Sequence, residues 1–260
     1  MDPDDTLEPT YLEKLLQAIE EEQSDIAICG YRILTYRNDQ VISEKIFQDA
    51  LQGSFDDFAE ELCVLHRNTL LFGPCNKLFR FSVVSQNKIT FGTTKRYEDS
   101  TFVYRYLQHC HRLAFTPVPL YNYSKFLTGR ITAVASFGNE YCEGAFKTYE
   151  EGQKLLQHLQ ELKMKQCAIA LFEERLKEHL QSCVLGEMIV SLSKSRLNWK
   201  ARKQYIQRLI EKFHLYLPGF DENAKNKTDN FIRNLANKKN INVIVAMTYL
   251  YYINNEVLRA

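Results

Sequence analysis

Three carboxylates stand within the first five residues of the chain, at Asp2, Asp4 and Asp5. Carboxylates this close together repel one another, so a fold either leaves them in water or gives them a cation. Mg²⁺ and Mn²⁺ take oxygen ligands and often join a protein carboxylate to the phosphates of a substrate. The spacing alone favours a solvated acidic terminus without a ligand, and a divalent-metal site is the alternative.

A second acidic position lies further along, where Glu98 and Asp99 precede apolar residues at helical spacing. Phe102, Tyr106 and Leu107 would share one side of that helix. A carboxylate at this place either caps the helix or acts on a substrate, and the residues alone favour the capping role. A chemical role for Asp99 requires that the fold bring it to the N-terminal acids.

The first half of the chain has the pattern of an α/β fold. Leu12, Leu15, Leu16 and Ile19 predict an amphipathic helix, and the apolar run at 26–31 predicts a buried strand. Weaker signals predict an edge strand at Val41–Ser43, a helix over Phe55–Leu65 and short extended segments bounded by prolines within Leu113–Tyr123.

Glycine and proline nearly vanish from Glu143 onward, which predicts a region made only of helices. We therefore expect an α/β part at 1–140 and a helical extension at 141–260. The apolar spacing places the helices at Phe146–Leu162, Cys167–Leu192, Tyr205–Phe213, Phe231–Leu235 and Ile241–Tyr252.

The charges nearly balance, with 33 Lys plus Arg against 32 Asp plus Glu, and this argues against a nucleic-acid partner. Seven scattered cysteines without a C-x-x-C pair predict free thiols in a reducing cytosol. The sequence has no signal-peptide pattern, and its longest apolar run is short of the ~20 residues that span a bilayer. The prediction is a cytoplasmic protein.

A basic, amphipathic stretch surrounds Trp199 in the second half of the chain. The composition suits a helix in peripheral contact with the inner face of the plasma membrane. A solvated helix face is the favoured interpretation, because runs of charge usually are solvated faces. Its cations are Lys194, Arg196, Lys200, Arg202, Lys203, Arg208 and Lys212.

Taken together, the motifs of the first half resemble the family-two glycosyltransferases of bacteria, which have the GT-A fold. The resemblance rests on Met1–Asp5 with Leu7–Pro9, Asp25–Tyr31, Asn76–Phe79, Tyr97–Asp99, and Pro119–Tyr123 followed by Gly129–Thr132. It implies a partial, Rossmann-like GT-A sheet. The implied reaction transfers a sugar from a nucleotide-sugar to a polysaccharide or lipid-linked acceptor of the cell surface, with inversion at the anomeric carbon.

The resemblance also implies roles for the acids. Asp2 and Asp4 would hold Mn²⁺ or Mg²⁺ together with the donor, and Asp5 would be an adjacent metal ligand. Asp99 would be the general base that takes the proton of the acceptor hydroxyl, with Glu98 beside it.

Several basic or polar residues are implied to contact the donor. Asn76 and Lys77 match a family motif, and Lys77 either meets phosphate or pairs with a carboxylate. Many relatives carry an arginine soon after the Tyr-x-Tyr segment, where this chain has Ser124 and Lys125. Lys125 or Arg130 is expected to substitute for it.

The family has several βα units before its D-x-D motif, and these form the nucleotide-binding half of the crevice. We therefore expect a truncated reading frame or fragment that is weak or inactive alone. The alternatives are a non-catalytic remnant and one half of a split transferase.

A less favoured alternative uses the same first residues. Asp2 to Thr6 also spells D-x-D-x-T, the nucleophile loop of haloacid-dehalogenase-like phosphatases. Asp2 would then attack phosphate and Asp4 would act as acid and base. That loop must follow a buried strand, which the sequence does not supply.

Overall fold

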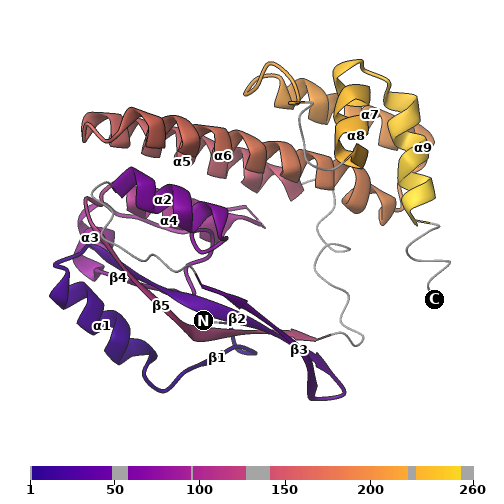
Figure 1. Cartoon of the computed structure of the whole chain (residues 1–260). Coiled ribbons are helices and arrows are strands. Elements are labelled where there is room, and N and C mark those ends of the chain that lie inside the picture. Colours follow the sequence, from indigo (N-terminus) through magenta and orange to yellow (C-terminus); the bar gives the residue numbers. More distant parts are fainter. Residues whose placement is uncertain (1, 49–57, 95, 127–140, 222–226, 253–260) are drawn as a thin grey trace. The chain divides into compact units, whose positions relative to one another are not determined.

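The computed structural model describes residues 2–48, 58–94, 96–126, 141–221 and 227–252 (Figure 1). The chain forms two compact units, each described by itself below. Unit 1 comprises Met1–Arg130 and Lys147–Leu176, and unit 2 comprises Ile131–Phe146 and Lys177–Ala260.

Unit 1 is built on a mixed sheet in the order β1-β5-β2-β3, with β4 paired to one end of β2. The central strands β2 and β5 run parallel, and the other pairs are antiparallel. The strands are β1 (Thr6–Leu7), β2 (Ile26–Arg37), β3 (Gln40–Phe47), β4 (Lys77–Phe79) and β5 (Leu113–Phe126).

A bulge lets β5 continue through its two prolines. Thr116 pairs with Cys29 and Pro119 with Gly30, so two residues of β5 lie between neighbouring pairs of β2. Because proline cannot donate to a ladder, its place at such an irregularity leaves no strand hydrogen bond unmade. Gly30 has no room for a side chain between its two neighbouring strands. A Cβ there would lie 2.9 Å from the Phe47 carbonyl oxygen of β3 and 3.1 Å from the Pro117 carbonyl oxygen in the bulge of β5.

Helices cover both faces of this sheet (Figure 1). Tyr11, Leu15 and Ile19 of α1 pack on Ala27 and Cys29 of β2, which point to the same face. The other face is covered by α2 and α4. The helices that lie wholly in unit 1 are α1 (Tyr11–Glu21), α2 (Phe58–Arg67), α3 (Phe81–Gln86) and α4 (Glu98–Leu107).

Two long helices contribute to both units. The segment 147–176 of α5 (Tyr141–Glu161) and α6 (Gln166–Gly186) belongs to unit 1. There the Arg105 guanidinium donates to Glu151 at 3.1 Å, and the rings of His66 and Phe172 meet edge to face. Part of the predicted helical extension, residues 147–176, therefore belongs to the same compact unit as the sheet.

Unit 2 consists of helices within the described residues. After α6 comes a π-helical turn, η3 (Glu187–Ser191), and then α7 (Trp199–Phe213), α8 (Lys227–Asn237) and α9 (Ile241–Tyr252). Asn198 caps α7 by accepting a hydrogen bond from the Ala201 N–H at 3.0 Å. No helix in the described ranges is long and apolar enough to cross a membrane.

The α/β class with a helical second half is confirmed. The prediction of short extended segments at 113–123 is wrong, because the bulge allows one continuous strand there. The single helix predicted to run to Leu192 is interrupted by the π-turn. Of the helix predicted over Phe55–Leu65, the first three positions lie outside the described residues.

Candidate functional site

A pocket of about 320 Å³ opens in unit 1 and gathers residues from five places in the chain. Asp2 comes from the segment before β1, and Asp99 comes from the first turn of α4. The remaining lining comes from β2, from the loop after α2 and from β5: Tyr31, Ile33, Thr69, Phe72, Gly73, Cys75, Asn76, Tyr121 and Tyr123.

The fold thus brings Asp2 and Asp99 to one pocket, as the resemblance implies. Their catalytic and metal-binding roles stay predictions. Within the described lining the pocket has these two carboxylates and no lysine, arginine or histidine. An anionic ligand would therefore be repelled unless a cation accompanies it.

Asp99 is held in a defined orientation at the start of α4. Its Oδ1 accepts a hydrogen bond from the Ser100 N–H at 2.7 Å, while Oδ2 has no hydrogen bond within the described chain. Asp99 is the second residue of α4, and Tyr97 occupies the N-cap position. The Oδ2 atom of Asp99 is therefore available to another partner.

The backbone before α4 is strained. Tyr97 has φ 62°, a left-handed conformation that costs a non-glycine residue on the order of 1 kcal/mol. The Tyr97 carbonyl accepts from the Thr101 N–H at 2.9 Å and from the Thr101 hydroxyl at 2.6 Å. These bonds hold the turn that presents Asp99 to the pocket.

Asp5 does not have the environment expected of a metal ligand. It is buried, its Oδ1 accepts from the Ser124 N–H at 2.8 Å, and its Oδ2 accepts from the Tyr121 hydroxyl. Both carboxylate oxygens thus accept hydrogen bonds from β5. These bonds offset the cost of burying a charged group. Asp5 thus fixes the acidic segment to the sheet, and its role as a metal ligand stays a prediction.

Asn76 and Lys77 brace the loop between Leu70 and β4. The Asn76 amide donates to the carbonyls of Cys29 at 2.8 Å and Leu70 at 3.2 Å. The buried Lys77 ammonium donates to the carbonyls of Leu70 and Gly73 and to the Asn76 side chain. An ammonium has three donors, so these bonds use all of them. None of these partners is a carboxylate. Contact of Lys77 with a phosphate stays a prediction.

Burial lowers the pKa of Lys77 from its usual 10.5 to about 7. At a pH between these two pKa values, Lys77 carries a proton in the unfolded chain but not in the folded chain. The free energy of unfolding should therefore rise with pH. The free energy of unfolding of the native chain minus that of Lys77→Met should rise from pH 7 to pH 9, by at most about 1.4 kcal/mol per pH unit. Urea denaturation at each pH measures it.

The matched control for this slope is Lys203→Met, which removes an exposed lysine of α7. Its stability difference from the native chain should stay flat over the same range. A flat difference for Lys77→Met as well would show that the ammonium titrates normally.

Aromatic side chains form the walls of the pocket, and the sequence did not single them out as site residues. Tyr31 lies beside Tyr121, and Ile33 beside Tyr123, because β2 and β5 pair in parallel in this register. Burial, and then the negative charge of Asp5, Asp2 and Asp4, raises the pKa of Tyr123. The alternation Tyr-Asn-Tyr in β5 was the available signal, since residues two apart share a face.

The other predicted site residues lie elsewhere. Asp4 is exposed, and Glu98 is the first residue of α4; neither lines the pocket. Lys125 is exposed near the end of β5, opposite Thr35 of β2, and is not in the lining. Arg130 lies outside the described residues.

The donor set nevertheless fits Mg²⁺ or Mn²⁺. The described residues hold no group of three His, Cys, Asp or Glu side chains suited to a metal ion. Mg²⁺ is usually bound by one or two carboxylates together with substrate phosphates and water. Asp2 at the pocket and the exposed Asp4 two residues later could supply such a partial set.

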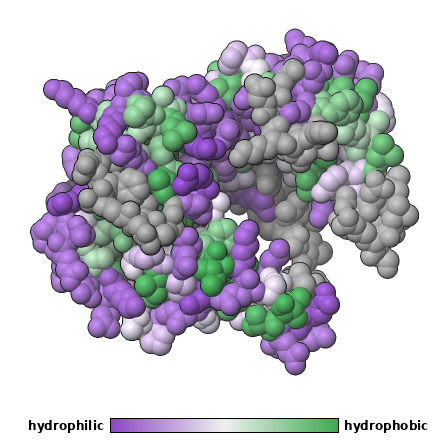
Figure 2. Space-filling view, in the orientation of Figure 1, coloured by the Kyte–Doolittle hydropathy of each residue, from purple (hydrophilic) through white to green (hydrophobic). Residues whose placement is uncertain are grey.

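The basic stretch around Trp199 is only partly exposed. Arg202 is buried and donates to the Thr248 hydroxyl at 2.6 Å, so it joins α7 to α9 and is not available to a membrane. Arg196, Lys200 and Lys203 are exposed. Hydrophobic residues are visible over α8 and α9 in Figure 2. Peripheral membrane contact stays a prediction.

No protein-family model matches the chain. In sequence it is 24% identical over 199 residues to the Bacillus subtilis (strain 168) protein named "Putative glycosyltransferase EpsH". The match covers 75% of this chain and 54% of that protein. The chain therefore spans about half the length of this curated relative.

The fold is similar to that of S. aureus TarS. The TM-score is 0.54 with TarS 1–349, at 14% identity, and the match covers 99% of this chain and 66% of that one. It is 0.52 with the same TarS segment in complex with UDP, covering 99% and 67%. It is 0.50 with the UDP-GlcNAc complex, covering 96% and 66%. At this identity the likeness shows a shared fold.

Proposed function

We propose that the acidic pocket of unit 1 is part of the active site of an inverting, metal-dependent glycosyltransferase of family two, with the GT-A fold. The reaction would transfer a sugar from a nucleotide-sugar to a hydroxyl of a glycan or lipid-linked acceptor. The observation that carries the proposal is that Asp2 and Asp99 line one pocket in a fold similar to TarS. Because the chain spans about half of EpsH, the activity is proposed for the whole protein that contains it.

Asp99 is the proposed general base. Its Oδ2 would accept the proton of the acceptor hydroxyl as that oxygen forms a bond to the anomeric carbon of the donor. The bond from that carbon to the diphosphate breaks in the same displacement, so the configuration inverts. The Ser100 N–H holds the other oxygen and thereby fixes the direction in which Oδ2 points.

Asp2 and Asp4 are the proposed holders of Mn²⁺ or Mg²⁺. When bound, the ion would neutralise the diphosphate that leaves. The charge of the pocket supports this assignment, since its two carboxylates would otherwise repel a donor diphosphate. Asp5 would keep the two acids in place by fixing the end of their segment to β5.

The aromatic walls suit a sugar ring. Pockets that bind small molecules are mostly apolar with a few placed polar groups, and this one combines three tyrosines and a phenylalanine with two carboxylates. The TarS structures contain UDP and UDP-GlcNAc, so UDP-GlcNAc is the first donor to test.

The metal assignment predicts a large effect of Asp2→Asn on Mn²⁺ binding. In the presence of UDP, the variant should need at least about tenfold more Mn²⁺ for half-saturation, because a neutral amide is a poorer ligand than a carboxylate. Electron paramagnetic resonance of free Mn²⁺ measures this without any acceptor.

The control is Asp39→Asn, at an exposed turn between β2 and β3 whose φ of 61° asparagine accepts well. It changes the charge equally but should leave Mn²⁺ binding unaltered. Equal binding by the native chain and Asp2→Asn would remove the metal site from the proposal.

A further inference from the structure

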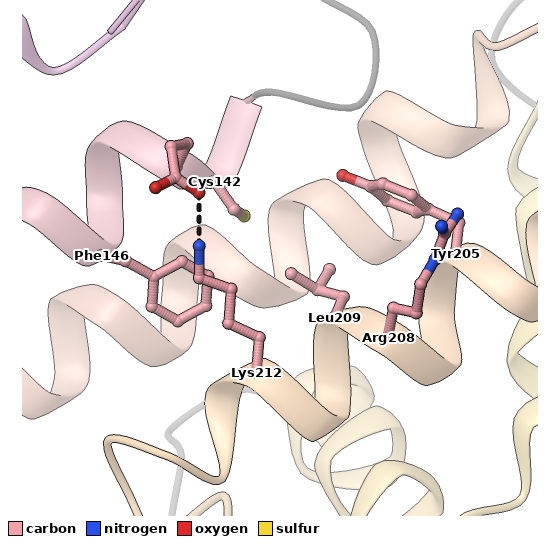
Figure 3. Close-up of a pocket in the computed structure, with 7 residues that line it drawn as sticks. Cys142, Phe146, Tyr205, Arg208, Leu209 and Lys212 are labelled. Atoms are coloured by element: carbon pink, nitrogen blue, oxygen red, sulfur yellow. Dashed lines mark hydrogen bonds and ion pairs between the residues drawn. The ribbon is translucent and has the colours of Figure 1, made fainter. Parts of the chain in front are cut away.

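A separate pocket of about 270 Å³ lies within unit 2, between the start of α5 and one side of α7 (Figure 3). No role in the proposed transfer is assigned to it. Two of its lining residues are cations one helical turn apart on α7, Arg208 and Lys212. The rest are Cys142, Glu143, Phe146, Tyr205 and Leu209.

The two cations differ in their partners. The Lys212 ammonium forms an ion pair with the Glu143 carboxylate and lies 4.8 Å from the centre of the Phe146 ring. Arg208 is exposed and makes no hydrogen bond or ion pair with any described residue. With Lys212 neutralised by Glu143, the lining keeps a net charge of one, contributed by Arg208.

The surroundings of Arg208 are fixed. Figure 3 shows it reaching alongside Tyr205, the residue one turn earlier on α7. The Tyr205 hydroxyl donates to the buried Glu187 at 2.5 Å. Glu187 opens the π-turn η3, and π-turns are found often at functional sites. The wall beside Arg208 is therefore a buried tyrosine that is hydrogen-bonded to a buried carboxylate.

From this geometry we propose that the pocket binds an oxyanion with a single negative charge, such as a phosphodiester or a carboxylate. The planar fork of a guanidinium matches both groups, and Arg208 is the cation of the lining that makes no ion pair with a described residue. Arg208 is the principal contact. Glu143 limits the affinity because it neutralises the neighbouring ammonium.

The proposal predicts opposite effects for two substitutions. Calorimetric titration at constant ionic strength would use dimethyl phosphate and acetate as the anionic probes and methyl glucoside as a neutral one. Arg208→Gln should weaken binding of the better anion at least about tenfold, since it removes a charged hydrogen-bonding group. Glu143→Gln should tighten it about threefold, because Lys212 then becomes available.

Lys203→Gln is the matched control, since it removes an exposed cation of the same helix outside the pocket. It should leave the affinity unchanged, and thermal unfolding would verify that every variant is folded. Binding of neither anion, or equal affinity of Arg208→Gln and the native chain, would overturn the proposal. So would weaker binding by Glu143→Gln, or binding of methyl glucoside alone. None of these measurements depends on sugar transfer.

Discussion

Asp99→Asn is expected to lower the rate constant of sugar transfer about 10²- to 10⁴-fold, the usual contribution of a general base. Asparagine keeps the hydrogen bond from the Ser100 N–H but has no oxygen that can take a proton in place of Oδ2. The stability of the fold and the affinity for UDP should change little, because Asp99 is only partly buried.

Rapid-quench measurement with UDP-GlcNAc and the whole protein would test this expectation, and Glu98→Gln supplies its control. Glu98 precedes Asp99 in the same turn and does not line the pocket, so its removal should cost at most a few-fold in rate. Full activity of Asp99→Asn, or an equal loss in both variants, would exclude Asp99 as the base.

Asp5→Ala is expected to destabilise the folded chain by about 3 kcal/mol. The substitution leaves the hydroxyl of Tyr121 and the N–H of Ser124 buried without their common acceptor. Each buried donor without a partner costs about 1–3 kcal/mol. The midpoint and slope of urea denaturation would give the change in the free energy of unfolding.

Two comparisons make this measurement specific. Tyr121→Phe removes one of the two hydrogen bonds and keeps the carboxylate, so it should cost roughly half as much. Asp4→Ala removes an exposed acid from the same segment and should stay within about 0.5 kcal/mol of the native chain. If Asp5→Ala were as stable as Asp4→Ala, the carboxylate of Asp5 would not fix the segment to β5.

The spacing of apolar residues predicted the elements whose residues are close together in the sequence. The spacing of Leu15 and Ile19 gave α1, and the apolar run from Ile26 gave the start of β2. The continuity of β5 could not be read from sequence, because Pro117 and Pro119 are compatible with a strand only where Gly30 lies opposite a bulge. That arrangement depends on the pairing of two strands far apart in the chain.

The same limit applies to the pocket. The order of motifs placed Asp2 and Asp99 together, but it could not separate an acid in the pocket from one turned toward the sheet. Asp5 differs from Asp2 in its burial against Tyr121, which depends on how β1 pairs with β5. Tyr31 enters the lining only because the parallel register sets it beside Tyr121.

The division of the chain inside α5 and α6, rather than between helices, limits how the protein can be dissected. A recombinant piece that stops at residue 140 would omit Glu151 and Phe172, the partners of Arg105 and His66 on the helices over the sheet. It would expose apolar surface that is covered in the full chain and would be prone to aggregate. Excision at Leu176 keeps that cover but severs α6 in mid-helix.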